Sequence, residues 1–208
     1  MSSMHILPFL ALSAVVVLTP GVDMALVTKN ALVHGRAAAY ATAVGVNLGI
    51  FFWTIAAALG LAAVVAASST AFLAIKLAGA LYLIYLGLKA LRRPGEAMTD
   101  GLPSRAPLSR RAAFLQGVAS NLLNPKIAVF FTSLLPQFVD SSHAAPQDFL
   151  ILGVLFNSLG VAWLVTYAAV ASRSRAVLAR PRVRRAVDRL SGIALVALGT
   201  RLALEHRR

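Results

Sequence analysis

Long runs of apolar residues dominate this chain and limit what it can fold into. They cover residues 6–22, 41–67, 70–88, 112–123 continuing through 127–139, 149–172 and 190–204. A helix that crosses a bilayer needs about 20 mostly apolar residues, and most of these runs are that long. The chain of 208 residues is 59% hydrophobic, against about 45–50% in an ordinary soluble domain. We therefore expect an all-α membrane protein.

The runs predict one transmembrane domain over residues 1–208 with six helices. We place the helices near residues 5–27, 39–66, 70–91, 112–138, 148–171 and 188–204. Met1 to His5 contains no Lys or Arg, so the first run lacks the basic start of a signal peptide and is interpreted as a retained helix. The alternative is a five-helix protein in which the first run does not span.

Positive charge gathers in the connections between the runs, and the net charge is +13. The connections after the first, third and fifth helices hold fifteen of the 20 Lys and Arg residues, mostly in 89–111 and 173–189. Cytoplasmic loops collect Lys and Arg, so 92–111 is predicted to be a cytoplasmic loop and both termini to face the outer, periplasmic side. Neither basic stretch contains an aromatic residue to stack on a base, and we expect no nucleic-acid partner.

The two halves of the chain, about 5–91 and about 112–204, resemble each other. Each has a basic-Leu-small-Gly segment followed by Leu-Gly-x-basic, at 76–89 in the first half and at 189–201 in the second. Each half also has an Asn followed closely by Gly in its second helix. Three helices are an odd number, so the second half must cross the membrane upside down. Inverted repeats are a common plan for secondary transporters.

Proline interrupts one apolar run in each half, at Pro20-Gly21 and at Asn124-Pro125. A proline inside a helix removes a backbone hydrogen bond and clashes with the preceding turn. In a membrane such a break occurs where protein or a wet cavity satisfies the freed groups. Paired interruptions are a pointer to the binding site of a transporter.

Few ionisable residues lie within the predicted spans, and charges there are expensive and usually functional. Asp23 follows the first break and Lys126 follows the second, and we expect them to converge near the pseudo-two-fold axis. Asp23 would receive a substrate ammonium or a coupling proton, and Lys126 a carboxylate, helped by a helix N-terminus. We expect a zwitterion to suit such a site. The candidates for binding substrate or protons are Asp23, Lys126, Asn47, Asn124, Asn157 and Lys76.

Several of the candidates also have a structural interpretation. Asp23 could cap the helix after the break or lie at the membrane interface, and Lys126 could form a buried ion pair. Lys76 could extend outward to the interface. Asn47 and Asn157 could hold helices together by interhelical hydrogen bonds. We interpret several other residues as packing or belt residues, namely the glycines 45, 49, 79, 87, 192 and 199 with Trp53, Trp163, Tyr82 and Tyr85.

Four segments of the sequence resemble the LysE/RhtB family of bacterial amino-acid exporters, and the resemblance covers residues 13–204. They are Thr19 to Asp23, Gly45 to Gly49, Lys76 to Gly87, and Phe114 to Gly117 with Asn121, Asn124-Pro125-Lys126 and Pro136 to Phe138. The family's usual first motif is Pro-Gly-Pro followed by Asp or Asn, and here Val22 replaces the second proline.

The resemblance implies export of amino acids from the cytoplasm across the bacterial inner membrane, driven by the proton gradient, and leaves a homodimer open. It does not choose among basic, hydrophobic and hydroxylated substrates, although a single acid in the spans disfavours a dibasic one. A divalent-cation exporter is the alternative, but one Asp beside a Lys makes a poor metal cage. An intramembrane enzyme is less favoured, because the four histidines all lie at ends or connections. We expect no metal and no cofactor.

Overall fold

The computed structural model describes residues 6–61, 69–92, 108–139, 145–173 and 181–204, and regular structure in these ranges is helical. The first half contains α1 (Ile6–Leu18), α2 (Val22–Val33), α3 (Arg36–Ala56), the π-helix η1 (Ala57–Leu61) and α5 (Ser69–Arg92). The second half contains α6 (Arg110–Leu122), α7 (Pro125–Val129), the π-helix η2 (Phe130–Leu134), the 3₁₀-helix η3 (Leu135–Phe138), α8 (Pro146–Arg173) and α10 (Pro181–Leu204). The prediction of an all-α membrane protein agrees with this architecture.

Two of the helices are long and apolar enough to cross a membrane unaided. They are the stretch Arg36–Gly60, which is α3 with its π-helical continuation, and α8. Two further spans are present if each bent pair counts as one, namely α1 with α2 and α6 with the segment Pro125–Phe138. The described residues therefore provide two to four spans by this test.

The first bend, of 45°, lies between α1 and α2. The residue before a proline avoids the helical region, so α1 stops at Leu18 and the chain restarts after Pro20. Gly21 takes the N-cap position of α2 in an extended conformation and makes no side-chain capping bond. Asp23 lies in the first turn of α2 and its side chain bonds elsewhere, so the alternative in which Asp23 caps this helix is wrong.

The second bend, of 46°, lies between α6 and α7. Here Asn124 is the N-cap, and its Oδ1 accepts a hydrogen bond of 3.1 Å from the backbone N–H of Lys126. Pro125 occupies the first turn of α7, where its missing N–H costs nothing. The sequence thus explains why α6 ends and α7 begins at this position.

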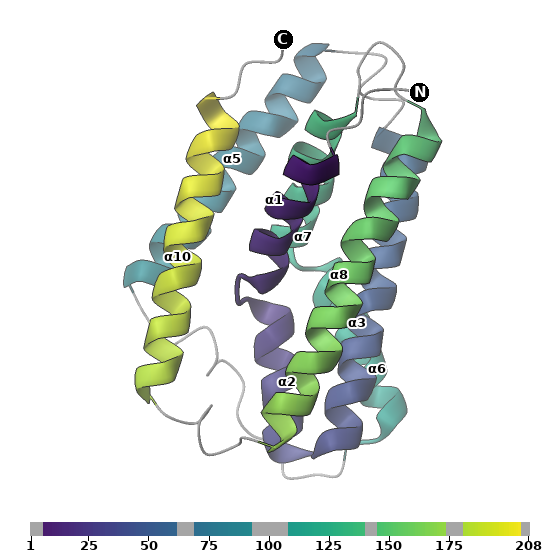
Figure 1. Ribbon diagram of the computed structural model, residues 1–208, viewed down its shortest axis with the longest axis vertical. Coiled ribbons are helices and arrows are strands. Elements are labelled where there is room, and N and C mark those ends of the chain that lie inside the picture. Colours follow the sequence, from purple (N-terminus) through teal and green to yellow (C-terminus); the bar gives the residue numbers. More distant parts are fainter. Residues whose placement is uncertain (1–5, 62–68, 93–107, 140–144, 174–180, 205–208) are drawn as a thin grey trace.

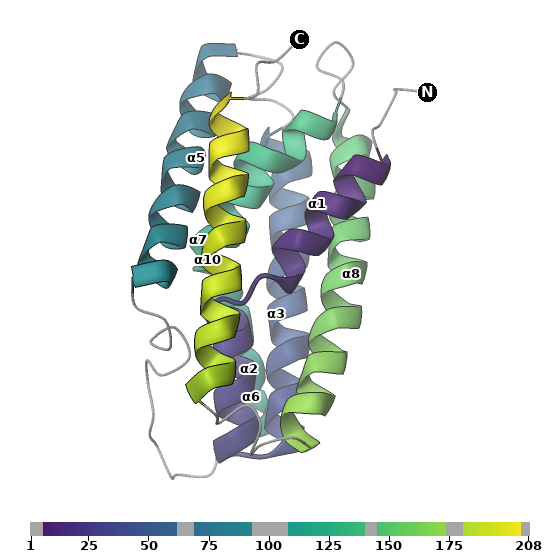
Figure 2. The same cartoon turned by 60° about the vertical axis from the view of Figure 1, so that its left-hand side comes forward.

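The helices run up and down the bundle in alternating directions (Figure 1). The start of α1 and the end of α10 lie at one end, and α2 and α8 finish at the other. Figure 2 shows α5 and α10 side by side along much of their length, and the contacts between residues agree. Helix α3 packs against both α6 and α8.

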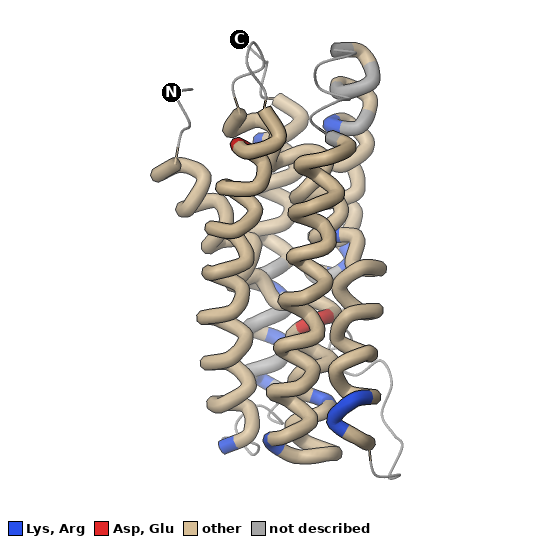
Figure 3. Tube along the Cα trace, turned by 90° about the vertical axis from the view of Figure 1, so that its right-hand side faces the viewer, with Lys and Arg blue, Asp and Glu red and all other residues tan. Residues whose placement is uncertain are grey.

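Charge is distributed unevenly between the two ends of the bundle. Lys and Arg gather toward the lower end in Figure 3, where α6 and α10 begin and α8 ends. The apolar middle of the bundle carries few charges. This pattern follows the sequence, in which basic residues flank the apolar runs.

The glycines serve close helix packing, as predicted. A Cβ atom added to Gly45 would overlap the carbonyl oxygen of Phe114 on α6. On the α5–α10 pair, a Cβ on Gly87 would come within 2.7 Å of the carbonyl oxygen of Gly192, and a Cβ on Gly199 within 2.7 Å of that of Ala80. Small residues let membrane helices approach at the backbone, and at these positions the approach leaves no room for a side chain.

Aromatic side chains fill the core on the side of the bundle where α1 begins. Phe130 of η2 stacks on Phe156 of α8 with ring centres 4.1 Å apart, and Phe131 meets Phe156 edge-on. Phe9 of α1 packs on Phe130 at 6.2 Å. All four rings are fully buried, so this cluster joins α1, η2 and α8 into one packed unit.

Candidate functional site

The carboxylate of Asp23 is buried where the two bends meet, with 8% of the residue exposed. Its Oδ1 accepts a hydrogen bond of 2.7 Å from the Ser120 hydroxyl. Its Oδ2 accepts bonds of 2.9 Å from Asn121 Nδ2 and 2.8 Å from Asn124 Nδ2. All three donors come from the end of α6 and the break that follows it, so the first break is tied to the second by this one side chain.

Neutral donors hold the Asp23 carboxylate, and none of its hydrogen-bond partners carries a positive charge. Burial of a carboxylate is costly unless hydrogen bonds compensate it, and three such bonds do so here. The position in the first turn of α2 adds the favourable end of the helix dipole. A carboxylate offers about four acceptor positions, so one remains for a further donor such as an ammonium or a proton.

The ammonium group of Lys126 binds backbone carbonyl groups at the end of α1. Its Nζ donates to the carbonyl oxygens of Val16 at 3.1 Å and of Thr19 at 2.7 Å. These carbonyls lack helical partners because Pro20 ends the helix. Lysine near a helix C-terminus also interacts favourably with the dipole. An ammonium has three N–H donors, so one remains after these two bonds.

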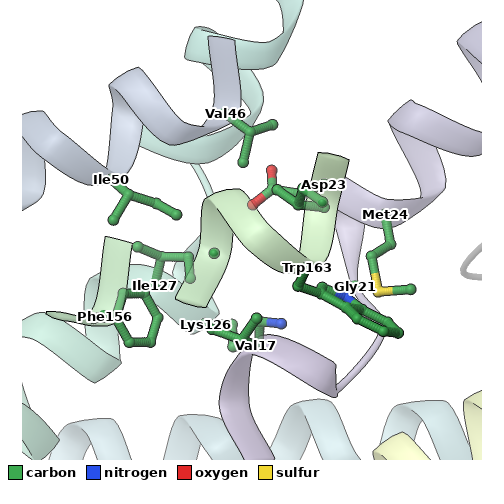
Figure 4. Close-up of a pocket in the computed structure, with 12 residues that line it drawn as sticks. Val17, Gly21, Asp23, Met24, Val46, Ile50, Lys126, Ile127, Phe156 and Trp163 are labelled. Atoms are coloured by element: carbon green, nitrogen blue, oxygen red, sulfur yellow. The ribbon is translucent and has the colours of Figure 1, made fainter. Parts of the chain in front are cut away.

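Asp23 and Lys126 line one small cavity at the bends, together with Gly21, Gly160 and Trp163 (Figure 4). The remaining wall is formed by apolar side chains of α1, α2, α3, α7 and α8. The cavity has a volume of about 30 Å³, which is room for about two water molecules. A molecule the size of an amino acid does not fit in that volume.

The other candidates from the sequence lie at different distances from this cavity. Asn124 bonds Asp23 directly, as described above. Asn47 donates to the Ala43 carbonyl of its own helix at 2.7 Å, and its Oδ1 is buried without a partner. That oxygen would lie 3.0 Å from a Cβ on Gly160, so Asn47 stands directly behind the cavity wall. Its amide bond within α3 is not the interhelical bond considered from the sequence.

Asn157 and Lys76 are not part of the cavity wall. The Oδ1 atom of Asn157 on α8 is buried without a partner among the described residues. Lys76 on α5 is only 5% exposed, so its side chain does not extend to the surface of the bundle, which argues against the snorkelling alternative. The cavity therefore joins Asp23 and Lys126 as predicted and leaves these two residues aside.

Ser120 and Asn121 are site residues that the sequence reasoning did not select. Both lie in the last turn of α6, and Asn124 follows at the break as the N-cap of α7. Three polar residues so close together within an apolar run were a usable signal. The sequence alone could not show that they face Asp23.

A second set of polar contacts joins α2 to its neighbours between the cavity and the basic end. The Thr28 hydroxyl lies 2.7 Å from the Tyr167 hydroxyl of α8. Asn30 Nδ2 donates to Thr42 Oγ1 of α3 at 2.7 Å and to Gln116 Oε1 of α6 at 3.3 Å. These bonds connect α2 with three other helices. We refer to Thr28, Asn30, Thr42, Gln116 and Tyr167 as the polar seam.

The bends, the buried charges and the cavity define a multi-helical membrane protein with a polar site between two broken helices. Within the described ranges, no three His, Cys, Asp or Glu residues gather as metal ligands would. A comparison with protein families matches residues 14–206 to the family described as LysE type translocator. The chain belongs to this family.

Several bacterial proteins are similar to the chain over most of its length. An uncharacterized membrane protein of Bacillus subtilis is 32% identical, over 97% of this chain and 100% of its own. A homoserine/homoserine lactone efflux protein of Salmonella typhimurium is 31% identical over 94% of both chains. A leucine efflux protein of Klebsiella pneumoniae is 27% identical over 96% and 95%. No solved structure was found to match.

The double role of Asn124 leads to a prediction about stability. Asn124→Ser and Asn124→Asp both keep an oxygen that can cap α7, and both remove the amide that donates to Asp23. Asn124→Asp also places a second carboxylate against Asp23, and like charges in a buried site repel strongly. We expect Asn124→Asp to lower the melting temperature of the purified protein in detergent clearly more than Asn124→Ser does. Equal melting temperatures for the two variants would show that the Asp23 contact contributes little.

Proposed function

We propose that this chain is a secondary transporter that exports amino acids across the bacterial plasma membrane. The observation that carries the proposal is the meeting of one buried carboxylate and one buried ammonium at a cavity between two broken helices, in a translocator family. The relatives named for efflux of homoserine and homoserine lactone, of leucine and of threonine support amino acids and closely related small molecules as the substrate class. The same names, together with the family, support a transporter rather than an enzyme.

In this proposal the two charges of an amino acid meet the two charges of the site. The substrate ammonium donates to the remaining acceptor position of Asp23, and the substrate carboxylate accepts the third N–H of Lys126. Charge-assisted hydrogen bonds of this kind are about twice as strong as neutral ones. A zwitterion compensates both buried charges at once, whereas a simple amine or a simple acid compensates only one.

We propose further that six helices form two inverted repeats. The bends of 45° and 46° at matching positions support this arrangement, as do the alternating helix directions (Figure 1). Gly87 and Gly199 are equivalent in the two repeats, and each lies against the backbone of the other helix of the α5–α10 pair. Symmetry of this kind lets one half rock against the other and expose a central site to each side in turn.

Different kinds of contact separate the cavity from the two ends of the bundle. Toward the basic end, the polar seam holds α2 against α3, α6 and α8 through hydrogen bonds between side chains. Toward the other end, the cluster of Phe9, Phe130, Phe131 and Phe156 blocks the way by packing. We propose that the polar seam opens to admit substrate from the cytoplasm and that the aromatic cluster separates to release it.

The proton gradient is the proposed driving force, with Asp23 as the group that takes up the proton. A carboxylate can hold either a proton or the substrate ammonium at its free position. Protonation from the outer side would therefore release the substrate, and loss of that proton to the cytoplasm would restore the site. One residue would then carry out both binding and coupling.

The proposed orientation places the basic end in the cytoplasm and both termini outside, following the bias of Lys and Arg toward cytoplasmic loops. The chain contains no cysteine, so single cysteines can report this directly. We expect Gln147→Cys, exposed at the start of α8, to react with a membrane-impermeant maleimide in intact cells. Ala37→Cys, exposed at the start of α3, should react only after permeabilisation. The reverse pattern would overturn the orientation.

Removal of the charge on Asp23 tests the proposed function. Bacteria that express the chain and are fed a panel of dipeptides should release one or a few amino acids into the medium. We expect Asp23→Asn to reduce this release by about 10-fold or more, since hydrogen bonds to charged groups contribute about 1.5–3 kcal/mol and 1.4 kcal/mol is a factor of ten.

Asp148→Asn is the matched control for this experiment. Asp148 is also buried, but it lies in the first turn of α8, where its Oδ2 accepts a hydrogen bond from the backbone N–H of Ala145, and the amide oxygen of Asn can accept the same bond. The control should export at the wild-type rate at equal membrane abundance. If no amino acid is released by the well-inserted wild-type chain, or if Asp23→Asn exports normally, the proposed function is wrong.

A further inference from the structure

The hydrogen bonds of Asp23 and Lys126 do not involve the indole N–H of Trp163. Trp163 of α8 lines the cavity, and its Nε1 is buried with no hydrogen-bond partner in the described parts of the chain. Buried indole N–H groups usually find a partner, and one left without a partner calls for an explanation. The cavity beside the ring supplies one, because a ligand can bring the missing acceptor.

The second tryptophan of the chain shows that a missing partner alone does not mark a site. Trp53 also has a buried Nε1 without a partner. Its ring stacks on Phe131 with centres 6.4 Å apart, and the residue is not on the cavity wall. What distinguishes Trp163 is therefore its place at the cavity.

Trp163 lies near the other free donor of the site. Figure 4 shows the end of the Lys126 side chain beside Gly21 and the Trp163 ring. A Cβ on Gly21 would come 3.5 Å from Lys126 Nζ, and Gly21, Lys126 and Trp163 all line the cavity. The third N–H of Lys126 is thus a charged donor at the cavity, and the Trp163 ring beside it carries a buried neutral N–H without a partner among the described residues. Two donors suit the two oxygens of a carboxylate.

The rest of the wall offers no further charge. Besides Asp23 and Lys126, the cavity is lined by glycines and apolar or aromatic side chains, among them Val46, Ile50 and Leu164. Asp23 is engaged by the substrate ammonium in the proposed function. A charged substrate side chain would then find no partner on this wall, and its desolvation would be costly.

We infer that Trp163 is a specificity-determining residue whose indole N–H donates to the substrate carboxylate, and that the substrates are amino acids with a free carboxylate and an uncharged side chain. The inference rests on the proposed function, since it names the substrate class of the same cavity. It adds that derivatives with a blocked carboxyl group, such as amides and methyl esters, are rejected. The contact forms when the bent helices separate, because the cavity of about 30 Å³ is too small for the substrate.

Counterflow into proteoliposomes that contain the purified full-length chain tests this inference. Each candidate amino acid is loaded inside, the same labelled amino acid is added outside, and unlabelled amino acid or its amide competes. For the wild type we expect the amide to compete at least about 10-fold more weakly than the acid. Trp163→Phe keeps the aromatic ring but removes the donor. It should weaken competition by the acid several-fold and change competition by the amide much less, so that the preference for the acid shrinks, while the bond to Lys126 preserves the rest of it.

Two further variants separate binding from packing. Trp53→Phe makes the same change away from the cavity and should retain the wild-type preference for the acid. Trp163→His retains a ring N–H and should preserve part of that preference. A Trp163→Phe protein that still prefers the acid as the wild type does, or that loses acid and amide binding equally, overturns the role of Trp163. A wild type without counterflow of any amino acid overturns the proposed function, and this inference with it.

Discussion

Two breaks in helices leave backbone groups unpaired inside an apolar bundle, and the fold depends on how these groups are satisfied. In a membrane interior water does not replace a lost backbone hydrogen bond. In this chain each break is stabilised by residues from the other half. Lys126, after the second break, donates to the carbonyls at the end of α1. Asp23, after the first break, accepts hydrogen bonds from Asn124 and its neighbours at the second.

This reciprocal arrangement explains why charged residues are tolerated at the site. Each charge already has partners in the closed structure, which offsets the cost of its burial. Neither charge is saturated, since one acceptor position of Asp23 and one N–H of Lys126 remain. In the proposed function, a zwitterion would therefore bind without first breaking an ion pair between the two residues. Because the cavity is small, the proposal also requires the bent helices to move when substrate binds.

The sequence predicted much of this arrangement, because its main signals are local. Apolar runs and prolines gave the helices, both breaks and the two charged residues beside them. The ends of helices are less well predicted by the sequence: α2 continues to Val33 and α10 begins at Pro181, where polar or basic residues predict connections. Such residues can continue a helix once it leaves the apolar region, so hydropathy alone does not show where it ends.

Contacts between distant segments could not be predicted in the same way. Ser120 and Asn121 at the end of α6 and Asn124 at the break lie close together in the sequence, but only the packing of this segment against α2 directs them to Asp23. The two carbonyl partners of Lys126 depend on the bend at Pro20 and on how the two breaks lie against each other. Trp163 resembled an ordinary core or belt aromatic in the sequence, and only the cavity distinguishes it from Trp53.

The central claim is that Asp23 and Lys126, on two different broken helices, bind one amino acid between them. A structure of the protein with the amino acid that it exports tests this most directly. We expect the ammonium of the bound amino acid to lie within hydrogen-bond distance of Asp23 and its carboxylate within hydrogen-bond distance of Lys126. An amino acid bound elsewhere, with the bonds from Ser120 to Asp23 and from Lys126 to Thr19 unchanged and the cavity still closed, would contradict it.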